Sequence, residues 1–289
     1  MLRNLISARP ADQEVNIDEM RSGYDMLGAM NPQATGAVIE AVNANGVPCE
    51  WITTPGADTE RAVVYVHGGG YAIGSLASHR SMLTHLSAAA NARVLAVEYR
   101  LAPEHPHPAA LDDAVTAYNW AMQNGATPER TVIGGDSAGG GLAIATLVAL
   151  REGGYPLPAA GVCISPWLDM EASSESMKQR AELDPMVKES DLLKWAGHYL
   201  NGLSPTTPLA NPLHAELKGL PPLLIHVGSH EVLLDDSKRL AQLARDAGVD
   251  VTLEVADEMI HVWHFFAGAV PEADASIAEV GMFIRNHTN

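Results

Sequence analysis

The stretch that decides the fold is residues 131–151, TVIGGDSAGGGLAIATLVALR. Its first part, Thr131–Gly135, is a short apolar run typical of a buried strand, and Ala138–Arg151 has the length and residue types of a helix. Between them, Gly135-Asp136-Ser137-Ala138-Gly139 is a Gly-x-Ser-x-Gly pattern in a strand–turn–helix context. The small residues allow a sharp turn that exposes the serine hydroxyl at a helix N-terminus, where negative charge is favoured. The pattern predicts a nucleophile, Ser137.

A glycine run earlier in the chain supports this prediction. Taken alone, the five-residue pattern also fits a glycine-rich turn with a serine as helix cap. His67-Gly68-Gly69-Gly70, however, ends the apolar strand Ala62–His67 and opens a loop, as the helper motif of such serine sites does. Amide hydrogens in such an oxyanion hole contribute roughly 3 to 4 kcal/mol each. We expect the donors to be Gly69, Gly70 and Ala138.

The remaining sequence alternates between two kinds of segment. Short apolar runs rich in β-branched residues predict strands at 49–53, 62–67, 93–99, 131–135, 161–165, 223–228 and 251–255. Segments with helical spacing lie between them, at 80–91, 110–124, 138–151, 237–247 and 273–286. This alternation predicts an α/β fold with a mostly parallel sheet flanked by helices on both faces.

Two regions interrupt the alternation and predict a helical cap. Asn16–Asn45 precedes the first strand and shows helical spacing, and Asp169–Pro212 is a long insertion with a predicted helix at Glu189–Leu200. We expect residues 1–45 and 169–212 to form a cap above a catalytic core of residues 46–168 and 213–289. The simpler interpretation of Asn16–Asn45 is a segment packed on the rim of the core.

Composition excludes several classes of function. Lys and Arg total 18 against 35 Asp and Glu, a formal net charge of −17, which disfavours nucleic acid and anionic membranes as partners. Cys49 and Cys163 lack metal-site spacing and are predicted to be buried thiols. Met1–Pro10 lacks the apolar stretch of a signal peptide, and no run reaches the roughly 20 apolar residues of a membrane span. We therefore expect a cytoplasmic protein.

Three motifs together resemble the bacterial hormone-sensitive-lipase-like (family IV) esterases. They are His67–Tyr71, Tyr99–Glu104 and Gly135–Gly139, in the family's order, and the resemblance spans nearly the whole chain. It implies the α/β-hydrolase fold with an eight-stranded sheet, an N-terminal pair of cap helices, and hydrolysis of short- to medium-chain esters without metal or organic cofactor. It is also compatible with a homodimer.

The resemblance assigns structural tasks to two further motif positions. Within Tyr99–Glu104, we expect Arg100 and Glu104 to form a buried or half-buried pair beside the floor of the site. His67 is expected to orient the glycine run by hydrogen bonding.

The base and the acid should follow the serine in chain order, acid first. The family's His-x-Trp pattern maps onto His261-Val262-Trp263, so the resemblance implies His261 as the base and leaves His264 to the core or a helix start. Relatives show Asp-Pro-x-x-x-Asp in the loop where this chain has Ser229–Asp236. Alignment on Asp235 gives Glu231 as the acid, because any carboxylate that accepts the histidine Nδ1 proton can do this task. Asp235, which also suits a helix cap, stays the alternative acid, and the role of His230 is open.

The predicted function is that of a serine carboxylesterase acting on a small-molecule ester through an acyl-enzyme. Tyr71 and Trp167 are the candidate lining residues of the substrate pocket. A lactone hydrolase or deacetylase would use the same residues. A non-catalytic ligand-binding protein on this fold is the alternative from a different class.

Overall fold

An eight-stranded sheet forms the centre of the protein in the computed structural model, which describes residues 16–289. The strands follow the order β1-β2-β4-β3-β5-β6-β7-β8, and from β4 to β8 all neighbours are parallel. The first two strands run antiparallel to their neighbours. The strand bounds are β1 Val38–Ala44, β2 Val47–Thr53, β3 Asp58–Val66, β4 Ala92–Val97, β5 Thr131–Asp136, β6 Ala160–Ile164, β7 Leu223–Gly228 and β8 Val251–Ala256.

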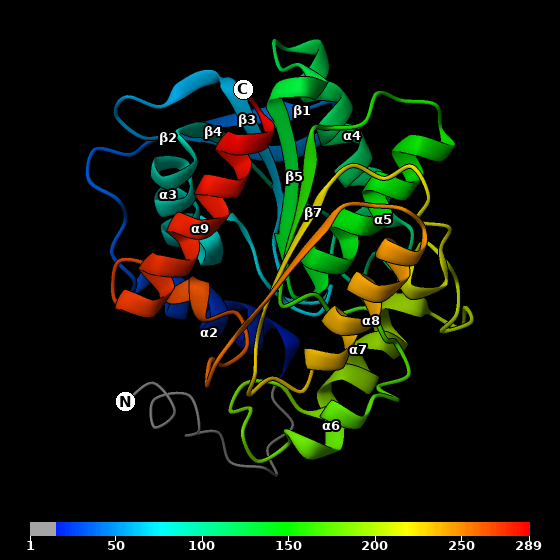
Figure 1. The fold of residues 1–289 in the computed structure, drawn as a ribbon. Coiled ribbons are helices and arrows are strands. Elements are labelled where there is room, and N and C mark those ends of the chain that lie inside the picture. The colour runs from blue at the N-terminus through cyan, green and yellow to red at the C-terminus, as the bar shows by residue number, and fades with distance from the viewer. Residues whose placement is uncertain (1–15) are drawn as a thin grey trace.

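Helices cover both faces of the sheet, as Figure 1 shows. On one face lie α3 (Leu76–Ala90) and α9 (Pro271–His287); on the other lie α4 (Ala109–Gln123), α5 (Ala138–Glu152) and α8 (Leu234–Asp246). Successive strand residues point to opposite faces, so a strand covered on both sides has to be apolar throughout.

The central strand β3 illustrates this double burial. Val64 and Val66 join the core cluster that contains α4, α5 and α8, whereas Val63 and Tyr65 join the cluster under α3 and α9. All four are at most 1% exposed. The uninterrupted apolar runs of the sequence are therefore the consequence of a sheet buried on both sides, and the predicted α/β fold with a mostly parallel sheet is confirmed.

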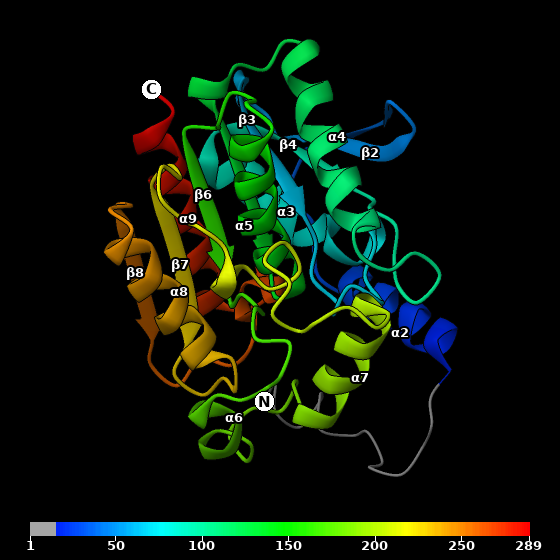
Figure 2. The ribbon, with the colours of Figure 1, turned by 90° about the vertical axis from the view of Figure 1, so that its right-hand side faces the viewer.

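Three further helices lie together at one end of the sheet (Figure 2). They are α2 (Ile17–Ala29), α6 (Glu175–Gln179) and α7 (Glu189–Leu200). Residues of α2 and α7 line the same cavity as residues that follow β3, β5 and β8. These helices thus lie over the carboxyl ends of the parallel strands, where the loops of α/β folds carry their functional residues. The 3-10 turns are Pro128–Arg130, Pro212–His214 and Trp263–Phe266.

The structure corrects one boundary of the predicted cap. Residues 38–44, assigned to the cap from sequence, form the edge strand β1 of the sheet. Most of its side chains are exposed or half-buried, so it lacks the apolar run that marks the inner strands. Asn45 and Gly46, both with positive φ (53° and 102°), make the tight turn to β2, as Asn-Gly pairs favour. The first fifteen residues of the predicted cap, including Met1–Pro10, lie outside the described residues.

The predicted pair of Arg100 with Glu104 is also wrong. Arg100 binds Asp113 of α4 through Nε and Nη2, at 2.8 to 3.1 Å. Glu104 instead accepts two hydrogen bonds from Arg21 of α2, at 2.7 and 2.8 Å. That contact with Arg21 lowers the pKa of Glu104 to about 2. Pairing across 83 residues ties the helix α2 to the core, and spacing in the sequence gave no indication of it.

Cys49 and Cys163 are free and buried, and burial raises the pKa of each thiol to about 12. No helix within residues 16–289 combines the length and the apolar character needed to cross a membrane.

Two glycines in helices give a matched test of the packing between α3 and α9. A methyl group at Gly281 of α9 would lie 2.4 Å from the backbone carbon and oxygen of Ala89, whereas a methyl at the exposed Gly23 of α2 meets no described atom within 4 Å. We expect Gly281→Ala to lower the free energy of unfolding by about 1–3 kcal/mol because it overpacks the contact. Gly23→Ala should raise it by about 0.5–1 kcal/mol. Denaturant unfolding of both variants checks this, and equal effects would contradict the helix contact.

Candidate active site

Ser137 occupies a sharp turn between β5 and α5. Its φ and ψ are 52° and −122°, which a residue with a side chain rarely adopts. The turn closes only because its flanking residues lack side chains: a Cβ on Gly135 would lie 2.2 Å from the carbonyl oxygen of Gly139, and one on Gly139 would lie 2.1 Å from that of Val66. The Gly-x-Ser-x-Gly spacing is therefore a steric requirement of this turn.

His261 and Glu231 form a hydrogen-bonded pair. Nδ1 of His261 lies 2.8 Å from Oε2 of Glu231. The imidazole is 5% exposed and the glutamate 0%. Burial alone would lower the pKa of His261, but the hydrogen bond and the negative charge of Glu231 outweigh it and raise that pKa above its usual 6.5. The contact also fixes the tautomer, because a carboxylate can only accept, so Nδ1 carries the proton and Nε2 remains for a second partner.

The other oxygen of Glu231 is fixed in place by two donors. Oε1 accepts hydrogen bonds from the Ser165 hydroxyl at 2.7 Å and from the Gly228 backbone N–H at 2.5 Å. Ser165 also accepts a hydrogen bond from the backbone N–H of Val262, next to His261. Both Ser165 and Val262 have positive φ (48° and 47°), which is unusual for residues with side chains and recurs at functional sites. Ser165 was not singled out from sequence, since its partners come from two distant loops.

The alternative residues of the sequence analysis lie elsewhere. Asp235 is in the first turn of α8, and its Oδ2 accepts a hydrogen bond from the backbone N–H of Ser176 in α6. His264 is fully buried, with Nε2 at 3.2 Å from Nδ1 of His226. Burial lowers the pKa of both imidazoles, that of His226 to about 4, so this pair is neutral and structural at pH 7. The backbone N–H of His230 donates to Met259.

Ser137, His261, Gly69 and Gly70 line one cavity of about 160 Å³. We call Gly68–Gly70 the glycine loop; Gly69 and Gly70 have φ of 115° and 61°, a region that favours glycine. Ala138 is the first, fully buried residue of α5. The rest of the cavity wall is almost entirely apolar. It consists of Met20, Tyr24 and Leu27 of α2, Ile73 after the glycine loop, Met186 and Val187 before α7, Leu192 and Trp195 of α7, and Val262 and Phe265.

Tyr71 and Trp167 are not among the residues that line this cavity. Both are 1% exposed, and Tyr71 stacks on Tyr199 of α7 with ring centroids 3.7 Å apart. Trp195 has the position that was expected for these aromatics: a Cβ on Gly70 would lie 2.2 Å from its ring. The helical pattern of residues 189–200 was visible in the sequence, but the side of the helix that meets the glycine loop was not.

The described residues offer no metal centre. Across residues 16–289, no group of three or more His, Cys, Asp or Glu is arranged to hold a metal ion. The chemistry that this arrangement supports is nucleophilic: a strained serine at a helix N-terminus, a buried imidazole paired with a carboxylate, and backbone amides of a glycine loop in one apolar cavity.

Comparison with known proteins identifies the family. The family described as having the α/β-hydrolase fold matches residues 63–265. The chain belongs to this α/β-hydrolase family. Its similarity to an acetyl-hydrolase of Streptomyces hygroscopicus is 42% identity over 288 residues, 100% of this chain and 96% of that protein. An esterase of Acinetobacter venetianus is 33% identical over 275 residues, 95% of this chain and 90% of that protein.

Solved structures of other α/β-hydrolases agree. A crystal structure of an esterase from the bacterial hormone-sensitive lipase family is 48% identical, with a TM-score of 0.97, covering 100% of this chain and 97% of that one. The esterase EstE5, in a crystal soaked with p-nitrophenyl butyrate, is 46% identical with a TM-score of 0.95, covering 99% and 97%. The resemblance to bacterial hormone-sensitive-lipase-like esterases, drawn from the sequence motifs, is confirmed.

The contact between His261 and Glu231 makes a prediction about titration. Because Glu231 raises the pKa of His261 and burial opposes it, Glu231→Gln should lower that pKa relative to the wild-type protein. The imidazole would then lose its proton at a lower pH. Nuclear magnetic resonance titration of the His261 ring measures this directly, with Asp235→Asn as the control that leaves the midpoint unchanged. A midpoint that stays at the wild-type pH in Glu231→Gln would contradict the role given to this carboxylate.

Proposed function

We propose that this esterase is a serine carboxylesterase in which Ser137 is the nucleophile, His261 the general base and Glu231 the acid of the triad. The observation that carries the proposal is the 2.8 Å contact between His261 and Glu231, with His261 and Ser137 lining one cavity. An imidazole fixed in this tautomer has Nε2 available to take a proton, as the triad scheme requires.

Acylation begins when Nε2 of His261 removes the proton of the Ser137 hydroxyl. The serine oxygen attacks the ester carbonyl carbon, and the carbonyl π electrons move to its oxygen to give a tetrahedral oxyanion. Backbone amides of Gly69, Gly70 and Ala138 donate hydrogen bonds to this oxyanion. When the oxyanion collapses, the bond to the alkoxy group breaks, and the imidazolium of His261 gives its proton to the leaving alcohol.

Deacylation repeats these steps with water in place of serine. His261 removes a proton from water, the hydroxide oxygen attacks the acyl carbon, and the serine oxygen leaves with the proton returned by His261. During both steps Glu231 stabilises the imidazolium, and Ser165 and Gly228 keep its carboxylate in one orientation.

We further propose that short- to medium-chain esters are the substrates. The cavity of about 160 Å³ is well below the roughly 300–1,000 Å³ of pockets for drug-sized ligands, and its wall is apolar. Relatives named acetyl-hydrolase and a related esterase soaked with a butyrate ester support this size class. A lactone hydrolase or deacetylase would use the same residues and is the second candidate.

The cap is part of the same proposal. We expect α2 and residues 169–212 to act as the cover of the site, because Tyr24 of α2 and Trp195 of α7 both line the cavity. The cytoplasmic location stays a prediction from the sequence, and the homodimer stays a prediction from the family resemblance.

Removal of the nucleophile gives the first test of this function. Ser137→Ala should reduce kcat by several orders of magnitude, on the order of 10⁶, because the acyl-enzyme cannot form. Hydrolysis of p-nitrophenyl acetate measures this, with circular dichroism to show that the variant is folded. Activity near that of the wild-type enzyme would exclude Ser137 as the nucleophile.

The assignment of the acid is tested by two matched carboxylates, four residues apart. Glu231→Ala should lower kcat by about 10⁴-fold, because His261 loses the acceptor for its Nδ1 proton. Asp235→Ala should affect stability more than kcat, since its carboxylate binds the backbone of Ser176. A larger loss of kcat in Asp235→Ala than in Glu231→Ala, with both variants folded, would reverse the assignment.

The proposed substrate class is tested with a panel of p-nitrophenyl esters from acetate to dodecanoate, together with simple lactones. We expect kcat/KM to be highest for acyl chains of about two to six carbons and to fall for longer chains, which exceed the cavity. A maximum at long chains, or turnover of lactones alone, would contradict this substrate class. No turnover of any ester would instead favour a ligand-binding protein.

A further inference from the structure

A second buried carboxylate lies beside the proposed nucleophile. Asp136, the last residue of β5, immediately precedes Ser137 and is 0% exposed. Its Oδ1 accepts hydrogen bonds from the Tyr65 hydroxyl at 2.9 Å and from the Gly68 backbone N–H at 3.1 Å. Its Oδ2 lies 3.3 Å from Nε2 of His79. The reaction steps described above give this group no task, although buried charges are costly unless a partner compensates them.

The carboxylate is in direct contact with the glycine loop. A Cβ on Gly68 would lie 2.2 Å from Oδ2 of Asp136, so the loop backbone packs against the carboxyl group itself. The hydrogen bond from the Gly68 N–H attaches the start of the glycine loop to Asp136, which is the residue immediately before Ser137 in the chain. One side chain therefore connects the two parts of the site whose separation decides whether Gly69 and Gly70 can reach an oxyanion on the serine adduct.

His79, which is 0% exposed, has a polar neighbour at each ring nitrogen. Its Nδ1 lies 2.8 Å from Oγ of Ser78, whose hydroxyl also lies 2.9 Å from the carbonyl oxygen of Ser75. The carboxylate of Asp136 only accepts, so Nε2 of His79 has to donate to it. This hydrogen bond fixes the direction of the contact between the two side chains.

This contact matters because the reaction develops negative charge nearby. An uncompensated carboxylate beside Ser137 would oppose formation of the oxyanion, whereas a carboxylate that accepts hydrogen bonds from His79, Tyr65 and Gly68 opposes it less. Burial alone would raise the pKa of Asp136, but the electrostatic attraction of His79 and the hydrogen bonds from His79 and Tyr65 outweigh it and hold the pKa below its usual value. Asp136 thus stays ionised at neutral pH and can accept the hydrogen bond from the Gly68 N–H.

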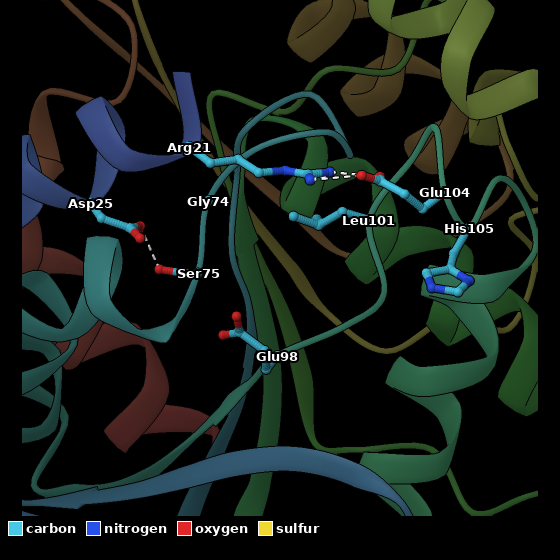
Figure 3. A pocket seen from close by; sticks show the side chains of 8 residues that line it. All are labelled: Arg21, Asp25, Gly74, Ser75, Glu98, Leu101, Glu104 and His105. Atoms are coloured by element: carbon cyan, nitrogen blue, oxygen red, sulfur yellow. Dashed lines mark hydrogen bonds and ion pairs between the residues drawn. The ribbon is translucent and has the colours of Figure 1, made fainter. Parts of the chain in front are cut away.

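The pair is also connected to the cap helix α2. Ser78 and Ser75 exchange hydrogen bonds at the start of α3, and the Ser75 hydroxyl donates to Asp25 of α2 at 2.6 Å. Figure 3 shows this last contact on the wall of a second cavity, of about 350 Å³. The ring of Tyr24, which lines the catalytic cavity, packs edge-on against His79. His79 is therefore held from the side of the cap and from the side of the core.

We propose that the hydrogen-bonded pair of Asp136 and His79 positions the glycine loop relative to Ser137, so that the amides of the loop reach the oxyanion. Both are positioning residues, since neither lines the catalytic cavity. The inference rests on the proposed function, because it gives the amides of Gly69 and Gly70 the task of binding the oxyanion. Hydrogen bonds to an oxyanion act in the transition state, so their misplacement lowers kcat and leaves KM nearly unchanged.

Asp136→Asn is the decisive variant, because it keeps the size of the side chain and an oxygen acceptor but removes the charge that His79 pairs with. We expect kcat for p-nitrophenyl butyrate to fall by about 10- to 100-fold, with KM within about threefold of the wild-type value. Affinity for a trifluoromethyl ketone that forms a tetrahedral adduct should fall by the same factor as kcat/KM. His79→Gln should reproduce this pattern. The double variant should lose no more kcat than the less active of the two single variants, because both substitutions disrupt the same pair.

Asp113→Asn is the matched control. It also neutralises a buried carboxylate that pairs with a cation, Arg100, but it lies away from the cavity, and its kcat should stay within about twofold of the wild type. Titration of the active sites with an aryl phosphonate corrects kcat for inactive protein. If Asp136→Asn does not fold, His79→Gln decides by the same measurements.

The outcomes separate this inference from the proposed function. An active Ser137→Ala would overturn the proposed function. An inactive Ser137→Ala, together with an Asp136→Asn whose kcat per active site is within twofold of the wild type, would overturn only the positioning role. Equal losses of kcat in Asp136→Asn and Asp113→Asn would also overturn it, because they would show a general effect of removing buried charge.

Discussion

The strained backbone of Ser137 is the constraint on which the rest of the structure depends. Holding a residue with a side chain at this φ and ψ costs on the order of 1–3 kcal/mol, and surrounding contacts have to offset it. The carbonyl oxygen of Ser137 accepts hydrogen bonds from Gly140 and Gly141 in the first turn of α5, and from Trp167 after β6. The same turn requires that Gly139 pack on the carbonyl of Val66, where β3 ends. The geometry of one residue thus fixes how three neighbouring strands end.

Glu231, the acid of the proposed triad, is a glutamate where the resemblance implies aspartate, and its surroundings accommodate the longer side chain. Its longer side chain has more rotamers to lose on burial, and an unpaired carboxylate oxygen would be costly. Gly228 and Ser165 satisfy Oε1, which leaves Oε2 for His261. The loop reaches this arrangement with Val232, whose backbone N–H donates to Asp184, in place of a proline that could not donate. Departure from the family's residue pattern is therefore matched by local hydrogen bonding.

Sequence reasoning succeeded where the determinant is local or follows from chain order. Seven strands, the turn at Ser137 and the helices that cover the sheet follow from apolar runs and glycine spacing. His261, named from chain order, contacts Glu231 and lines one cavity with Ser137. The edge strand Val38–Ala44 was missed because exposure on an antiparallel edge removes the apolar signal.

Contacts between distant segments could not be predicted from one sequence. The pairing of Arg21 with Glu104 joins residues 83 positions apart, and no periodicity encodes it. The same limit explains the lining of the cavity. Trp195 contacts Gly70 because of the way α7 is oriented about its axis, whereas Tyr71, adjacent to Gly70 in sequence, stacks on Tyr199 instead. Local pattern fixes the elements, but their mutual orientation depends on packing that only the folded chain reveals.

The division of the cavity wall has a consequence for how this enzyme can change over evolutionary time. The reactive groups come from the ends of core strands, where the steric demands around Ser137 leave little freedom for substitution. Much of the apolar wall comes instead from α2 and the segment before and within α7, which the sheet does not need. Substitutions there alter the space offered to a substrate while the reactive geometry persists. Substrate range and chemistry can therefore diverge independently among descendants of one sequence.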